Sequence, residues 1–190
     1  MRWQQLFADL TAQFDEAEAA AELAEAASRT RAEVGAVPLA GRLAGSVGAD
    51  VRLRCRGAGQ LAGSLADVGP DWLLLVDERG AESVVATSAI TSATGLARRT
   101  VLEEDDGRPR VRFDLRLVLR ATARDRSAVV LTTDDGAVLT GTIDRVGADF
   151  VELAEHPIGE PRRAASVRAV HAVPLAAVAV LTRGPEDAPA

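Results

Sequence analysis

One pattern of strands and turns occurs twice in the chain. Residues 62–75 read AGSLADVGPDWLLL and residues 140–153 read TGTIDRVGADFVEL, at an offset of 78. A second match, between VVATSAI (84–90) and AVPLAAV (172–178), has an offset of 88, so the second copy holds an insertion. The segment EHPIGEPRRAAS (155–166) has the Pro and Gly of such a loop. A repeat of this length indicates one supersecondary unit used twice, which constrains the fold more than local propensities do.

Each copy predicts short, bent strands. Apolar residues alternate with arginines at the start of the first copy: Val51, Leu53 and Cys55 against Arg52, Arg54 and Arg56. This period of two predicts a strand with one buried and one exposed face. Gly63 lies inside the next expected strand, where glycine often marks a bend. LLLV (73–76) and two shorter segments complete five strands, which favour closure into a small barrel.

Helices are expected before each set of strands. The apolar stripe of the first helix consists of Trp3, Leu6, Phe7, Leu10 and Phe14, which are candidates for oligomerisation or docking. The predicted fold is mainly β with helices: an N-terminal amphipathic helix and two helix-plus-small-barrel units. The expected boundaries are 1–36 for the helix, 37–97 and 113–183 for the two units, 98–112 for a charged linker and 184–190 for a disordered tail.

Charge is distributed unevenly along the chain. The net charge is −6, which argues against the protein as a whole being a nucleic-acid binder. Residues 108–126 nevertheless hold seven arginines against two aspartates, while residues 1–34 are acidic. Two interpretations of the basic segment remain open: a polyanion-binding surface, or pairing with the acidic N-terminal helix and solvent. The candidate nucleic-acid or polyanion ligands are Arg52, Arg54, Arg56, Arg112, Arg116, Arg120 and Arg124.

The pattern V-x-L-x-x-x-x-G-x-x-L-x-G-x-I-x-x-V-G-x-D-F-V-x-L at 129–153 resembles the first signature of Sm-like proteins, most closely bacterial Hfq. VPLAAV (173–178) resembles the closing turn and strand of that fold, which is an SH3-like small barrel. The resemblance implies ring assembly and RNA binding. Pro174, Leu175 and Ala176 replace the basic and histidine residues of Hfq. The whole chain also resembles an uncharacterised bacterial protein family.

The sequence contains little that indicates catalysis. Its single cysteine and two histidines do not have metal-ligand spacing, and no phosphate-binding or nucleophile motif is present. We therefore predict a protein that is not an enzyme and has no cofactor, metal or small-molecule substrate. No apolar run is long enough for a membrane span and the first residues lack a signal core, which predicts a cytoplasmic location away from membranes.

These observations lead to two functional hypotheses. The first is a non-catalytic adaptor or assembly protein, built from tandem Sm-like barrels, that binds a protein partner or self-associates. The alternative is a regulatory protein that binds RNA or DNA through its arginine-rich surfaces.

Overall fold

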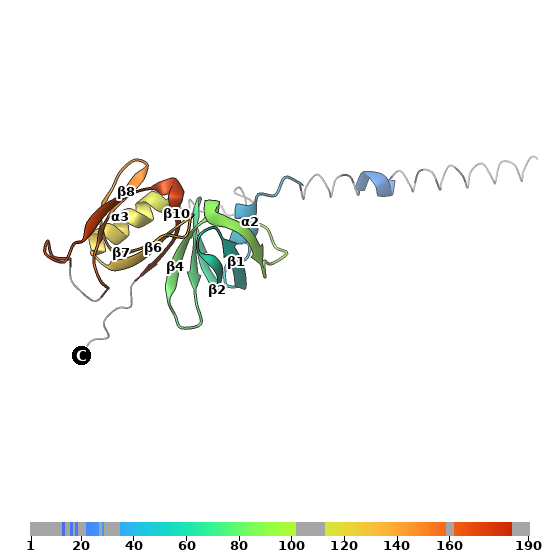
Figure 1. Ribbon diagram of the computed structural model, residues 1–190. Helices are drawn as coiled ribbons and strands as arrows, with labels where there is room; N and C mark the ends of the chain where they lie inside the picture. The colour runs from blue at the N-terminus through green and yellow to red at the C-terminus, as the bar shows by residue number, and fades with distance from the viewer. Residues whose placement is uncertain are drawn as a thin grey trace, which may run out of the picture. The chain divides into compact units, whose positions relative to one another are not determined.

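The computed structural model describes residues 13, 16, 18, 22–26, 28, 35–101, 113–158 and 162–183 (Figure 1). The chain divides into two units, 1–38 and 39–190, which are described separately. In the first unit, the described residues up to 28 are all helical. The stripe of Trp3, Leu6, Phe7, Leu10 and Phe14 lies outside the described residues, as does most of the predicted helix.

The second unit has two halves with the same element order. The first half contains α2 (Leu39–Ala44), β1 (Asp50–Cys55), β2 (Gly59–Val68), β3 (Trp72–Val76), β4 (Glu82–Ala86), the 3₁₀ helix η1 (Thr87–Ala89) and β5 (Ile90–Thr94). The second half contains α3 (Leu115–Asp125), β6 (Ala128–Thr133), β7 (Val138–Val146), β8 (Phe150–Glu155), β9 (Ala169–Pro174), η2 (Leu175–Ala177) and β10 (Val178–Arg183).

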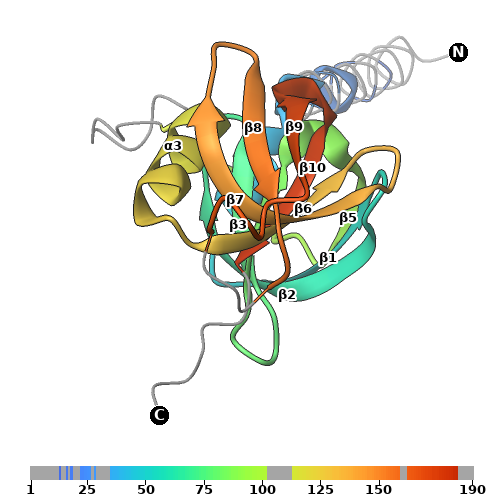
Figure 2. The same ribbon diagram turned by 60° about the vertical axis from the view of Figure 1, so that its left-hand side comes forward.

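All ten strands belong to one antiparallel sheet in the order β5-β1-β2-β3-β4-β10-β6-β7-β8-β9 (Figures 1 and 2). The pairing of β4 with β10, which we call the joint, connects the two halves. β5 and β9 form the two edges of the sheet, which we call the open edges. The order β5-β1-β2-β3-β4 of the first half therefore recurs as β10-β6-β7-β8-β9 in the second.

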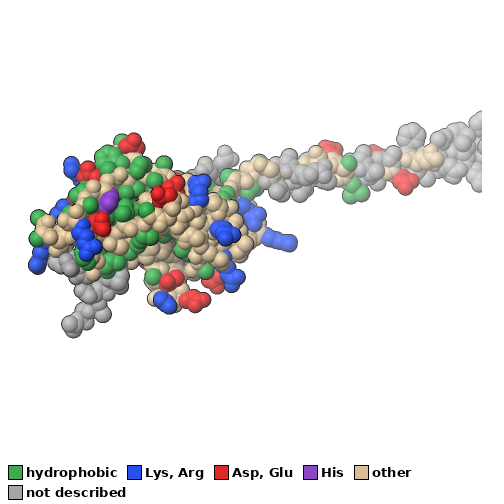
Figure 3. All heavy atoms as spheres, viewed as in Figure 1, with side chains coloured by type: hydrophobic (Ala, Val, Ile, Leu, Met, Phe, Trp, Pro, Cys, Tyr) green, Lys and Arg blue, Asp and Glu red, His purple; other side chains and the backbone are tan. Residues whose placement is uncertain are grey.

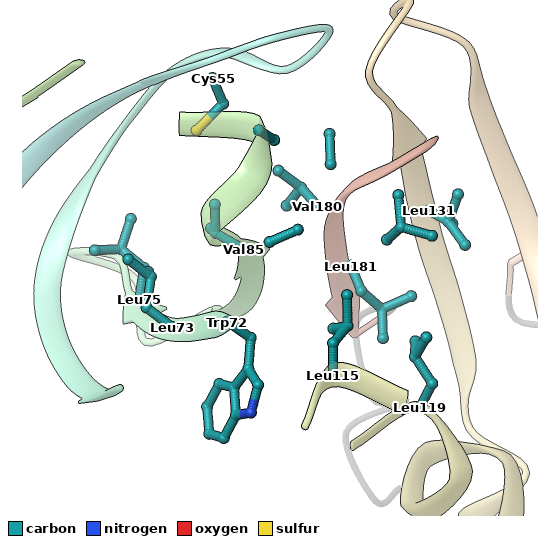
Figure 4. Close-up of a cluster of buried hydrophobic side chains, with 14 of the residues drawn as sticks. Cys55, Trp72, Leu73, Leu75, Val85, Leu115, Leu119, Leu131, Val180 and Leu181 are labelled. Atoms are coloured by element: carbon teal, nitrogen blue, oxygen red, sulfur yellow. The ribbon is translucent and has the colours of Figure 1, made fainter. Parts of the chain in front are cut away.

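The prediction of two closed barrels is wrong. Closure would require β4 to pair with β5 in the first half, and β9 with β10 in the second. Instead, β4 pairs with β10, and the sheet stays open. This pairing places Val85 opposite Val180 and Val84 opposite Leu181, so the joint buries apolar side chains of both halves. Figure 4 shows Val85, Val180 and Leu181 in a core that includes Cys55, Leu75, Leu119 and Leu131.

Glycines allow the strands of both halves to bend. A Cβ atom on Gly63 would lie 2.3 Å from the carbonyl oxygen of Val76, and one on Gly141 would lie 1.9 Å from that of Ala154. Each glycine is followed by a register shift, between Leu65 and Asp67 in β2 and between Ile143 and Arg145 in β7. Such bulges bend a strand and increase its twist. Neighbouring backbones thus approach closely at the same place in both halves.

The helix α3 also ties the halves together. Its N-cap residue Asp114 accepts a hydrogen bond from the backbone N–H of Leu117 at 2.8 Å. The N–H of Leu115 donates to the carboxylate of Asp71, in the β2–β3 turn, at 2.7 Å. Two N–H groups of the first helical turn are therefore satisfied by carboxylates, one of them from the other half. Leu115 and Leu119 are buried against the common core.

Candidate functional site: the open edges and the arginine surfaces

The alternation predicted for β1 is confirmed. Val51, Leu53 and Cys55 are buried, whereas Arg52, Arg54 and Arg56 are exposed. The guanidinium of Arg56 donates to the carbonyl oxygen of Ser88. Arg52 borders a groove of about 730 Å³, where the other charged residues are Asp50, Asp77, Glu78 and Arg79. Carboxylates therefore outnumber guanidiniums in this groove, which does not favour a polyanion.

The arginines of α3 occupy a different part of the molecule. Arg120 and Arg124 are exposed, and the guanidinium of Arg116 lies 3.7 Å from the carboxylate of Asp114. Arg112 lies outside the described residues. α3 packs against β7 of the second half, and five strands separate β7 from β1 in the sheet. The structure therefore does not combine the arginines of β1 and α3 into one patch.

Basic and acidic side chains alternate over the visible surface. Figure 3 shows Arg side chains interspersed with Asp and Glu over the folded sheet. Asp144 illustrates the local pairing: its carboxylate accepts from Arg126 at 3.2 Å and from Arg162, in the loop after β8, at 2.5 Å. The Asp144 carboxylate raises the pKa of the Arg162 guanidinium, mainly through this hydrogen bond. Paired arginines of this kind stabilise a loop and leave less positive charge for a ligand.

The aromatic side chains of the two repeated turns serve the fold. The indole ring of Trp72 covers Gly69, where a Cβ atom would meet the ring at 2.2 Å, and Phe150 covers Gly147 in the same way at 2.4 Å. Trp72 is 8% exposed and its indole N–H donates to the carbonyl oxygen of Phe113 at 2.5 Å. The described position of Trp72 therefore leaves no free ring face for stacking on a base.

Cys55 and His156 are buried parts of the fold. Burial raises the pKa of the Cys55 thiol, which keeps it protonated and unreactive. The buried His156 ring is held by the hydroxyl of Thr142 at 2.8 Å and by the carbonyl oxygen of Pro157 at 2.9 Å. Among the described residues, no group of three potential metal ligands converges. In the same part of the chain, no helix combines the length and apolar character needed to cross a membrane.

The feature that sequence reasoning missed is the pair of open edges. β5 has the sequence ITSAT and β9 the sequence AVHAVP, and neither holds an Asp, Glu, Lys or Arg. Natural sheets usually protect edges with charged side chains, because unpaired N–H and C=O groups can pair with another strand. Val170 of β9 is 56% exposed, and Ala172 beside it is also exposed. The absence of charge in these two segments is a signal that was present in the sequence.

The N–H groups on the open side of β9 can be assigned from the register. The N–H of Leu175 donates to the carbonyl oxygen of Asp149, which lies opposite it across the β8–β9 ladder. Antiparallel strands direct alternate residues to opposite neighbours. The N–H groups of Val173 and His171 therefore face β8, and those of Ala172 and Val170 face the open side. Among the described residues, this edge thus combines N–H groups that face the open side with the small side chain of Ala172, while the His171 ring lies 2.7 Å from the Glu155 carboxylate of β8.

Comparison of the chain with protein-family models, with curated proteins and with solved structures finds no match in any of the three. The resemblance to Sm-like proteins accordingly remains a prediction made from the residues alone.

Proposed function

We propose that the chain is a non-catalytic assembly protein that binds its protein partners through the open edges of its sheet. The observation that carries this proposal is that one sheet ends in two strands, β5 and β9, that hold no Asp, Glu, Lys or Arg. Strand addition to such an edge supplies main-chain hydrogen bonds as affinity, with alternate side chains as the source of specificity. The paired and structural roles of Asp144, His156 and Cys55 agree with a function that needs no reactive group.

Affinity purification of the full-length chain from its host tests this function. Ala172→Pro removes the N–H that faces the open side of β9, and Ala172→Ser changes the side chain but keeps the N–H. We expect a protein partner, including untagged copies of the chain, to be recovered with the wild type and Ala172→Ser and lost with Ala172→Pro. Equal recovery by all three forms would overturn the proposal.

Nucleic-acid binding is the second candidate function, favoured by the exposed Arg120 and Arg124 one turn apart on α3. Phosphate contacts by arginine give an affinity that falls steeply with salt. In the same purification, this function predicts ribonuclease- or deoxyribonuclease-sensitive material that is lost when Arg116, Arg120 and Arg124 are all changed to Glu. The absence of such material in the wild type would exclude this candidate.

A further inference from the structure

We propose that the groove beside Arg52 binds an extended peptide segment of a partner protein, which places a histidine side chain against Ser64. The groove is lined by residues of β1, β2, the β3–β4 turn and the end of β5. Its volume of about 730 Å³ lies in the range of ligand-binding pockets. The site uses β2 and not the open backbone of β5 or β9, so it goes beyond the function proposed for the open edges.

The same place in the second half is filled by the chain itself. At the offset of 78, Ser64 corresponds to Thr142 and Ala62 corresponds to Thr140. The buried ring of His156 lies against the hydroxyl of Thr142, with Nε2 2.8 Å from that oxygen. The backbone N–H of His156 donates to the carbonyl oxygen of Thr140 at 3.1 Å. One histidine thus makes both a main-chain and a side-chain hydrogen bond to β7.

The first half leaves the corresponding place open. Glu78 stands at the position of His156, but it is exposed, and its carboxylate has no hydrogen bond or ion pair with any of the described residues. The chain turns away here, because the carboxylate of Asp77 accepts the N–H groups of Arg79 and Ala81, both at 2.8 Å. This tight turn joins β3 directly to β4, whereas the second half carries its insertion at this point. The first half therefore lacks the segment that fills the site.

β2 presents unpaired polar groups to the groove. The N–H of Leu65 donates to the carbonyl oxygen of Ala49, on the β1 side of the strand, at 2.9 Å. Because alternate residues of antiparallel strands face opposite neighbours, the N–H and C=O groups of Ala62 face the other side. The β2–β3 ladder begins only at Ser64, so Ala62 has no strand partner there among the described residues. The hydroxyl of Ser64 also has no hydrogen bond within the described part of the chain. These groups correspond to the two that His156 binds in the second half.

The charges around the groove favour a basic side chain over an acidic one. The carboxylates belong to Asp50, Asp77 and Glu78, and the guanidiniums belong to Arg52 and Arg79. Among the described residues, none of these five groups takes part in an ion pair. A histidine suits this surface because its ring can carry a proton and has a nitrogen for the serine hydroxyl. A phosphate or carboxylate ligand would meet an excess of negative charge.

Titration of the full-length chain with a synthetic peptide tests the site. The peptide LAQHPI copies residues 153–158, with glutamine in place of the glutamate. We expect saturable changes in the NMR amide signals of Ala62 and Ser64, because the histidine would bind the carbonyl oxygen of one and the hydroxyl of the other. The signal of Arg120 on α3 should not change. The peptide LAQAPI, which has no histidine, should bind about fivefold more weakly, as expected for one lost hydrogen bond.

Two variants of β2 provide matched controls. Ser64→Ala removes the hydroxyl that lines the groove, and Ala66→Ser adds a hydroxyl on the same strand outside the groove. Ser64→Ala should weaken binding of LAQHPI about fivefold and leave LAQAPI unchanged, while Ala66→Ser should affect neither peptide. The proposal is overturned if millimolar LAQHPI gives no saturable change, or if Ser64→Ala weakens both peptides equally. Ala172→Pro should leave peptide binding unchanged, so a failure of this site is distinguishable from a failure of the function proposed for the open edges.

Discussion

β4 and β9 occupy equivalent places in the two halves, yet β4 is covered by β10 and β9 is open. The side chains of these two strands also differ in burial. Val84 and Val85 of β4 pack into the common core, whereas Ala172 of β9 is exposed and only Val173 is buried. The same contrast holds for the turns, because Trp72 is buried and donates to the carbonyl oxygen of Phe113, while Phe150 is half-buried. The comparison teaches that the same strand position is paired on both sides where its residues are apolar, and is paired on one side only among the described strands where they are smaller.

The largest expected difference concerns these two aromatic residues. Trp72→Ala removes a buried ring and its hydrogen bond to Phe113, so we expect it to lower the free energy of unfolding by about 3–5 kcal/mol. Phe150→Ala acts on a half-buried ring and should cost about 1–2 kcal/mol. Urea unfolding of the two full-length variants measures both. Equal losses of unfolding free energy in the two variants would contradict the distinction between the buried aromatic residue of the first half and the half-buried one of the second.

Proline substitutions compare the joint with the open edge directly. Val84→Pro removes an N–H directed toward β10 and leaves its acceptor unpaired, which should lower the free energy of unfolding by about 2–4 kcal/mol. Ala172→Pro changes the equivalent residue, whose N–H faces solvent in the single chain, and should stay within about 0.5 kcal/mol of the wild type. The measurement is urea unfolding at a protein concentration low enough to prevent association. A large loss for Ala172→Pro would show that β9 is already paired within the chain.

A smaller difference is expected for the aspartates of the two turns. The carboxylate of Asp71 accepts the N–H of Leu115 at the start of α3, so Asp71→Ala should cost about 1 kcal/mol, as the loss of a helix cap does. The exposed carboxylate of Asp149 has no hydrogen bond with any of the described residues, and Asp149→Ala should leave the stability nearly unchanged. Thermal unfolding of the two variants checks this. An equal fall in melting temperature for Asp149→Ala and Asp71→Ala would contradict the role of Asp71 as a cap of α3.

The smallest expected effect is on pH dependence and concerns the turn between β6 and β7. The hydroxyl of Thr133 and the N–H of Ala137 donate to the carboxylate of Asp135, which lowers the pKa of this group in the folded chain. A lowered folded pKa gives stability that is complete above the ordinary aspartate pKa and is lost as the pH falls through the folded value. Asp135→Asn should therefore weaken the acid dependence of the melting temperature slightly. An unchanged acid dependence would contradict this assignment.

Gly57 occupies the corresponding position in the first half, so that turn has no such group. Introducing an aspartate there would not create a matching group, because Gly57 has a φ of 69° and a Cβ atom would lie 1.9 Å from the carbonyl oxygen of Thr133.

Local features of the fold could be predicted from the sequence. The alternation of Val51, Leu53 and Cys55 with arginines places β1 and its buried face correctly, because side-chain direction in a strand depends only on residue parity. Gly63 and Gly141 lie where the strands approach their neighbours closely, as expected for glycine inside a strand. These features depend on residues close together in the chain, which is why the sequence reveals them.

The connection between strands could not be predicted in the same way. The pairing of Val85 with Val180 joins residues far apart in the chain, and it uses backbone groups that every residue possesses. Apolar residues on β4 are compatible with closure on β5 and with pairing to β10, so the pattern alone does not choose between them. The candidate site was missed for the same reason. An edge strand is one that pairs on one side only, and among the described strands this follows from the pairing of residues far apart in the chain. The arginines at 52 and 120 were correctly placed on exposed surfaces, but the sequence could not show that they lie on separate halves.

The central proposal is that an open edge of the sheet binds a protein partner by strand addition. Residue-resolved amide hydrogen exchange of the intact chain, measured with and without the partner recovered by affinity purification, tests it most directly. We predict that exchange at Ala172 slows when the partner is bound, while the amide of Arg79, which donates to the Asp77 carboxylate in the β3–β4 turn, keeps its rate. Unchanged exchange at Ala172 in a sample that light scattering shows to be complexed would contradict the proposal.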